Sequence, residues 1–326
     1  MRLSAICIIT ALGVSACGGG GGGTGTTTLG VSYPSASDFS ALPVSSTNAT
    51  SLYSGTTTTL ADDTTSTPSV SADAFTYQPN SALNTLDRIV ELYPTFTPRN
   101  ADTLSTRQSA QCNGGGTLTL TGSAQLASAG DTLTATFNNC ITAGASIHGR
   151  FSMTKLSSEV GNNDLRIDFD DLRTSDATQS VYVDGDMTIR ASELGATQYA
   201  SIESTRLNVK DSATGDVVFT NLSIAGELDS DGAQRLRMTY TMASDQLNGR
   251  IAVSTPTQLA FAANQTRPTT GILRIAGDGG SYVEFDADTG NLATVQMTVN
   301  NGTSTVSNTV TWDSLGGSPL TELLDF

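Results

Sequence analysis

Side chains that commonly perform catalysis are scarce in this chain, which has a single histidine, His148. A Ser-His-Asp or Cys-His site would have to use it, and a zinc site built on several histidines is excluded by count. His148 precedes Gly149 in a segment that we predict to be a turn, with no nucleophile beside it. Ser152 and Lys155 have the S-x-x-K spacing of penicillin-recognising serine enzymes, but that motif requires a helix and this segment alternates like a strand.

Clustered aspartates offer a second chemistry. Asp168 and Asp170 share one face of a predicted strand, and Asp184 and Asp186 flank a glycine. Two carboxylates at a suitable separation can hydrolyse a glycosidic bond. The chain has only 1 Trp and few other aromatic residues on which a sugar could stack. We therefore interpret these aspartates as a solvated strand face and rank a carboxylate-based hydrolase third among the functions.

Two further aspartate pairs are candidates for a Ca²⁺ site, Asp229 with Asp231 and Asp286 with Asp288. An EF-hand loop starting at Asp286 would place Met297 at the twelfth position, where Glu is required, so that frame fails. Aspartates in turns also accept hydrogen bonds from nearby amides, which is the alternative explanation. The sequence predicts no cofactor, no metal site and no catalytic residues, hence a protein that is not an enzyme.

The N-terminus carries the most specific motif. Arg2 precedes an apolar run of about a dozen residues, too short to span a bilayer and typical of a secretory signal. The run ends in Val14-Ser15-Ala16-Cys17, which resembles the lipobox of bacterial lipoproteins. The resemblance implies cleavage before Cys17, lipidation of that cysteine and a stable membrane anchor. Gly18, in place of Asp, favours the outer membrane, with the protein facing the periplasm or the cell surface.

Charge and cysteine content fit an envelope protein. The net charge is −15, so nucleic acid is an improbable partner. Cys7 would leave with the signal and Cys17 would carry lipid. Cys112 and Cys140 then remain as a pair in an oxidising compartment, and we predict a structural disulfide between them.

Composition divides the chain into three parts: a signal peptide (1–16), a lipidated cysteine with a flexible tether rich in Gly, Ser and Thr (17–74), and a folded domain (75–326). Within the domain, apolar residues at three- and four-residue spacing predict one amphipathic helix at about 81–93, which would cover an edge or open end of a sheet.

Residues 116–312 alternate apolar and polar side chains, as in Leu165 to Asp170, and are divided by Gly-, Asn- and Asp-rich turns. Roughly twelve to fourteen strands with short connections favour antiparallel neighbours. Between Ile202 and Leu207 the apolar phase changes from even to odd positions, which predicts a bulge or bend.

A long meander with one apolar face must curl to bury that face. We expect a mainly β fold in which a large antiparallel meander forms a closed or half-open barrel with one capping helix; the alternative is a β-sandwich. A lipoprotein of this form is similar in architecture, without shared motifs, to the LolA/LppX-type lipid-binding proteins. We expect an envelope lipoprotein that binds a lipid or other apolar ligand inside the sheet; the alternative is a structural or adhesive surface module.

Overall fold

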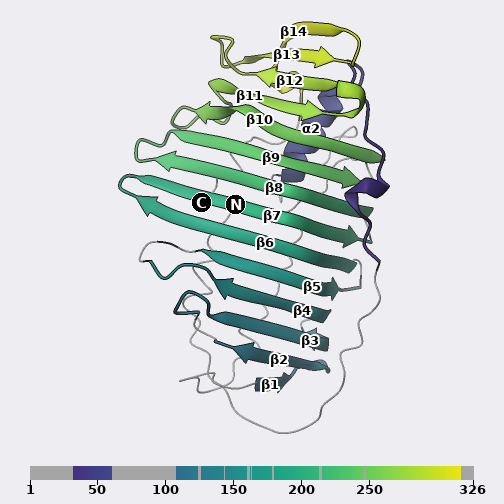
Figure 1. Cartoon of the computed structure of the whole chain (residues 1–326), viewed down its shortest axis with the longest axis vertical. Coiled ribbons are helices and arrows are strands. Elements are labelled where there is room, and N and C mark those ends of the chain that lie inside the picture. Colours follow the sequence, from purple (N-terminus) through teal and green to yellow (C-terminus); the bar gives the residue numbers. More distant parts are fainter. Residues whose placement is uncertain are drawn as a thin grey trace.

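The computed structural model describes residues 32–60 and 108–316, apart from residues 124–125, 143, 160–161, 163, 178–179, 213–214 and 246. These residues form one antiparallel sheet whose 14 strands lie side by side in chain order, from β1 to β14 (Figure 1). The predicted antiparallel meander is therefore confirmed. Lipobox residues 14–17 and the helix predicted at 81–93 lie outside the described residues.

The strands are longest in the middle of the sheet and shorten towards both ends. Their bounds are β1 Gln108–Gln111, β2 Thr117–Gly122, β3 Thr132–Thr142, β4 Ala145–Lys155, β5 Leu165–Ser175, β6 Ser180–Leu194, β7 Thr197–Asp211, β8 Gly215–Asp229, β9 Gln234–Ser244, β10 Gly249–Phe261, β11 Thr270–Ala276, β12 Tyr282–Asp286, β13 Thr294–Asn300 and β14 Thr305–Thr311.

The sheet does not close into a barrel, because β1 and β14 each pair with only one neighbour, β2 and β13. A closed barrel needs strands of matched length and a consistent stagger. Here the first strand has 4 residues and the central strands have 15. The half-open form of the prediction fits this sheet, whereas the closed barrel is not confirmed.

Alternation within each strand gives the sheet an apolar inner face and a polar outer face. In β5, Leu165, Ile167 and Phe169 are buried, whereas Arg166 and Asp170, which point to the other face, are exposed. Side chains of the same kind continue across the sheet and form one hydrophobic cluster. Burying this inner face is the main favourable contribution to folding.

A row of β-bulges crosses the middle of the sheet. The pairing register shifts where β3 holds one residue more than β4, β5 one more than β4 and β6, β7 one more than β6, and β8 one more than β9. Asn139, Asp171 and Asn221 at these points have positive φ angles of 48°, 47° and 51°. The shift in β7 lies between Glu203 and Leu207, so the bulge predicted there is confirmed.

Glycines in the intervening strands make room for the bulges. A Cβ atom on Gly149 of β4 would lie 2.0 Å from the carbonyl oxygen of Asp171, and one on Gly185 of β6 would lie 2.0 Å from that of Arg206. Both glycines also have positive φ, 102° and 125°. Glycine tolerates both the conformation and the contact, because it has no Cβ.

Residues 32–48 run from the outer face around one end of the strands (Figure 1). The short helix η1 (Ala36–Asp38) covers Val218 and Ala243 on the outer face of β8 and β9. The chain then pairs with the start of β10, where the amide of Leu42 donates to the carbonyl of Arg250 over 2.9 Å.

Helix α2 (Ala49–Leu60) follows and packs on the inner face, behind the upper strands in Figure 1. Its Ala49, Leu52 and Tyr53 are buried, and the Tyr53 ring lies 4.7 Å from the Phe285 ring of β12, centroid to centroid. In the described part of the chain, no helix is long and apolar enough to cross a membrane.

Residues 32–60 thus differ from the flexible tether predicted over 17–74. Composition favoured a tether because the sequence of α2 is rich in Thr and contains Gly55. Both threonine and glycine are poor helix formers. Ala49, Leu52 and Tyr53 nevertheless share one side of the helix. Their contact with the sheet stabilises the helix, although its intrinsic helix propensity is low.

The predicted Cys112–Cys140 disulfide is present, with Cα atoms 5.4 Å apart. It links the turn before β2 to the bulged part of β3. A loop closed over a sequence separation of 28 residues stabilises the fold by roughly 3.5 kcal/mol in the chain-entropy description.

The bulge row gives a stability prediction. Gly185→Ala should lower the free energy of unfolding by about 3 kcal/mol, because the new methyl meets the Arg206 carbonyl and the backbone keeps a positive φ. Gly290→Ala is the matched control: its φ is 70°, but no atom lies within 4 Å of the new methyl, so a loss of about 1 kcal/mol is expected. Equal losses in urea unfolding would contradict the role assigned to the bulge.

Candidate functional site

The three residues considered for nucleophilic catalysis all lie in β4. His148 is within the strand, opposite Arg173 of β5, so the predicted turn at this position is wrong. The turn was expected because of Gly149, which instead accommodates a bulge in the neighbouring strand. Ser152 and Lys155 are on the same strand, three positions apart and therefore on opposite faces, as the sequence indicated.

Three of the clustered aspartates have partners with structural roles. Asp168 accepts three hydrogen bonds from the guanidinium of Arg166, and Asp170 pairs with Arg150 across the strands at 2.5 Å. Asp186 accepts from the backbone amides of Thr205 and Arg206 at 3.3 Å each, and so satisfies the bulge in β7. Two of these carboxylates thus pair with arginines on the outer face, and the third satisfies backbone amides of a bulge.

Asp184 differs from its neighbours. Partial burial raises the pKa of its carboxyl group, and the negative charges of Asp171 and Asp170 raise it further. A backbone hydrogen bond from Asp171 and the Arg206 guanidinium oppose the shift. Burial and the Asp171 charge also raise the pKa of Tyr33, which precedes η1. This is a crowded acidic region under the N-terminal segment.

The four Ca²⁺ candidates all take part in local bonds. Asp229 pairs with Arg235 and accepts from the Thr197 hydroxyl at 2.9 Å. Asp231 accepts from the Ala233 amide at 3.0 Å, and Asp286 from the Asp288 amide at 2.9 Å, both as Asx-turns. Among the described residues no three acidic, His or Cys side chains are grouped to hold a metal ion.

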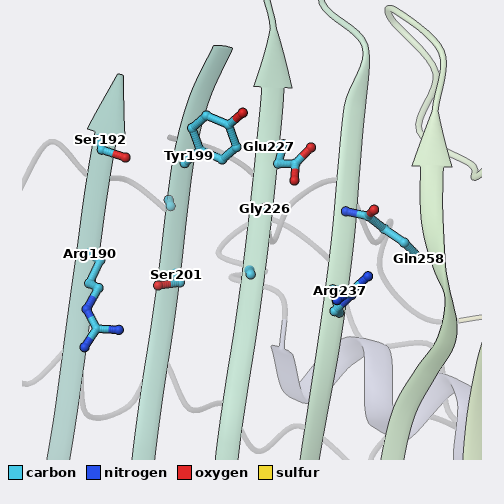
Figure 2. Close-up of a pocket in the computed structure, with 10 residues that line it drawn as sticks. Arg190, Ser192, Tyr199, Ser201, Gly226, Glu227, Arg237 and Gln258 are labelled. Atoms are coloured by element: carbon cyan, nitrogen blue, oxygen red, sulfur yellow. The ribbon is translucent and has the colours of Figure 1, made fainter. Parts of the chain in front are cut away.

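A groove of about 430 Å³ lies on the outer face of β6 to β10 (Figure 2). It runs across five adjacent strands. Two polar residues at alternate positions line it from each of β6 and β7, and one polar residue from each of β8, β9 and β10. Its lining comprises Arg190, Ser192, Tyr199, Ala200, Ser201, Ala225, Gly226, Glu227, Arg237 and Gln258. Small residues at the centre, Ala225 and Gly226, leave the hollow that the longer side chains border.

Charge pairing distinguishes the two arginines of the groove. Arg190 is bound to Glu203 at 2.9 Å, and Glu227 is bound to Arg235. Arg237 is exposed and forms no ion pair within the described part of the chain. Its guanidinium is therefore available to a carboxylate or phosphate group, with the Gln258 amide and the Ser201 hydroxyl as further hydrogen-bonding groups.

Sequence reasoning missed this groove. The longer side chains that border it occupy outward positions of their strands, and the sequence alternation indicated those positions. Which outward residues lie side by side depends on the strand register, including its bulge shifts, and no local pattern specifies it.

The inner face holds buried hydroxyl groups in an otherwise apolar surface. Tyr240 of β9 is 2% exposed and Ser204 of β7 is 5% exposed. Ser204 pairs with Leu222 of β8, which lies level with Tyr240, so the three follow one another across the sheet. Within the part of the chain that the structure describes, neither hydroxyl has a hydrogen-bond partner. The same holds for the hydroxyl of Thr56 in α2.

The aspartates give a prediction with opposite signs at two nearby positions. The folded-state pKa of Asp184 is raised, so its ionisation favours the unfolded chain and stability falls as pH rises through that pKa. Asp184→Asn should therefore raise stability at pH 7 and flatten its dependence on acidic pH. Asp186→Asn should lower stability by about 1 kcal/mol, because the bulge amides lose a charged acceptor. Urea unfolding from pH 4 to 8 measures both; the same sign for both variants would contradict this assignment.

Comparison of the chain with protein families, with curated proteins and with solved structures gives no match. The comparisons therefore give no support to the expected resemblance to LolA/LppX-type proteins.

Proposed function

We propose that this protein is a non-catalytic, lipid-anchored protein of the cell envelope that binds an apolar ligand with one polar group on the inner face of its open sheet. The lipobox resemblance at Cys17 supports the anchor and the outer-membrane location. The continuous apolar face, with β1 and β14 unjoined, supports the binding surface.

The observation that carries the proposal is the pair of buried hydroxyls of Tyr240 and Ser204, which have no hydrogen-bond partner among the described residues. A buried polar group without a hydrogen bond costs about 1–3 kcal/mol, so native structures rarely keep one without a reason. Both groups lie among apolar side chains, beside Leu222. A molecule with an apolar chain and a carboxyl, ester or hydroxyl group would satisfy the hydroxyls and match their surroundings.

The outer-face groove favours a second candidate function, a surface module that recognises a partner. Exposed Arg237 and its polar neighbours suit an anionic group on that partner. The two candidates use opposite faces of the sheet, so variants on each face can separate them.

Tyr240→Phe tests the first proposal. The change keeps the buried ring and removes only the hydroxyl. If that hydroxyl holds the ligand, binding of a fluorescent fatty acid to the full chain should weaken about fivefold, the equivalent of one hydrogen bond of about 1 kcal/mol. Native mass spectrometry of the chain isolated from membranes should also show an adduct that organic extraction removes.

Tyr199→Phe is the matched control, since it makes the same change in the outer groove and should leave fatty-acid binding unaltered. Absence of both probe binding and adduct in the unaltered protein would refute the ligand-binding function. A cell-surface partner whose binding is lost in Arg237→Ala, and retained in Tyr240→Phe, would instead establish the surface module.

A further inference from the structure

The last strand of the sheet has an open edge. β14 pairs with β13 through seven consecutive residues without a register shift, and within the described residues no strand pairs with its other side. Residues 305–309 and 311 are exposed, and Val306, at 53%, is the most exposed of the large apolar side chains. Backbone N–H and C=O groups along this edge are therefore available to another strand.

β14 lacks the features by which proteins usually protect an edge. Its sequence, Thr-Val-Ser-Asn-Thr-Val-Thr, has no charged residue, no proline and no bulge. In a chain with a net charge of −15, a seven-residue exposed strand without charge is also one that can approach an identical strand without local repulsion.

The sequence of β14 is nearly the same in both directions about Asn308. In an antiparallel pair centred there, Val306 would face Val310 of the second copy, Thr305 would face Thr311, and Ser307 would face Thr309. Cross-strand pairs of Val with Val and of Thr with Ser or Thr are favourable in sheets. Such self-complementarity is the requirement for a two-fold symmetric interface.

We propose that β14 is a docking edge for a second copy of this chain, in which two β14 strands pair antiparallel about Asn308. On the inner side, Val306 and Val310 continue the apolar stripe of Val295 and Val299 in β13. Pairing would extend this stripe from one copy to the next and cover Val306. The interface is small compared with the roughly 1,200 Å² of stable complexes, so the dimer is weak in dilute solution. Copies held at one surface pair more readily.

Asn308→Cys tests the arrangement directly. At the two-fold axis the introduced thiols lie on directly opposed residues, whose Cα atoms are about 4.5–5.5 Å apart in antiparallel pairs, within disulfide range. Mild oxidation of the full chain should link two copies through this position, identified by mass spectrometry of the joined peptides. Ser304→Cys is the matched control: it is equally exposed, but its two copies would be eight residues apart, roughly 27 Å.

A charge variant tests the same edge without a crosslink. Thr309→Lys places two lysines near the axis and should weaken self-association at least tenfold in sedimentation equilibrium, whereas Thr303→Lys, in the turn before β14, should not. Both side chains are exposed, so the fold should be retained, which circular dichroism checks. Equal crosslinking of the two cysteine variants would overturn the proposal, as would self-association that is unchanged by Thr309→Lys.

Discussion

The bulges in the middle of β3, β5, β7 and β8 keep the apolar side chains of this sheet on one face. Strand side chains alternate with a period of two, so a strand that changes phase would otherwise present its second half to water. In β5 the buried residues are odd-numbered up to Phe169 and even-numbered from Leu172. The extra residue in the bulge shifts the alternation by one position, so the even-numbered side chains that follow it lie on the same face as the odd-numbered ones before it. Gly149 and Gly185 let the bulged backbones approach, and Asp186 satisfies their amides in β7.

This arrangement explains why the acidic cluster lies where it does. The bulges leave backbone amides on the outer face that are not paired in the ladder, and carboxylates are strong acceptors for them. Asp186 has this role, while Asp168 and Asp170 pair with arginines on their own and the neighbouring strand. Asp184, half-buried under the N-terminal segment, has the least favourable environment of the group. A pair of hydrolytic aspartates would need carboxylates that are accessible to a substrate. Three of these four carboxylates instead bind arginines or backbone amides of the sheet.

The N-terminal segment connects the two faces. η1 covers part of the outer face, the chain passes the start of β10, and α2 lies on the inner face. Its contacts extend from Arg206 of β7, whose guanidinium donates to the Pro34 carbonyl, to Phe285 of β12, so this segment stabilises the middle and late strands of the sheet. The proposed ligand contacts, Ser204 and Tyr240, lie on the inner face of the middle strands β7 and β9.

Much of the fold was predictable from the sequence by itself. Alternation and turn residues determined an antiparallel meander and an approximate number of strands, the phase change after Ile202 indicated a bulge, and two remaining cysteines indicated a bridge. The same phase change in β5 and β8, at Phe169–Leu172 and Phe219–Leu222, was available and missed. Tertiary structure alone decided the rest. Helix 49–60 depends on contact with the sheet, because its own propensity is poor. The groove beside Arg237 and the alignment of Ser204 with Tyr240 depend on the register between strands, which is a non-local property.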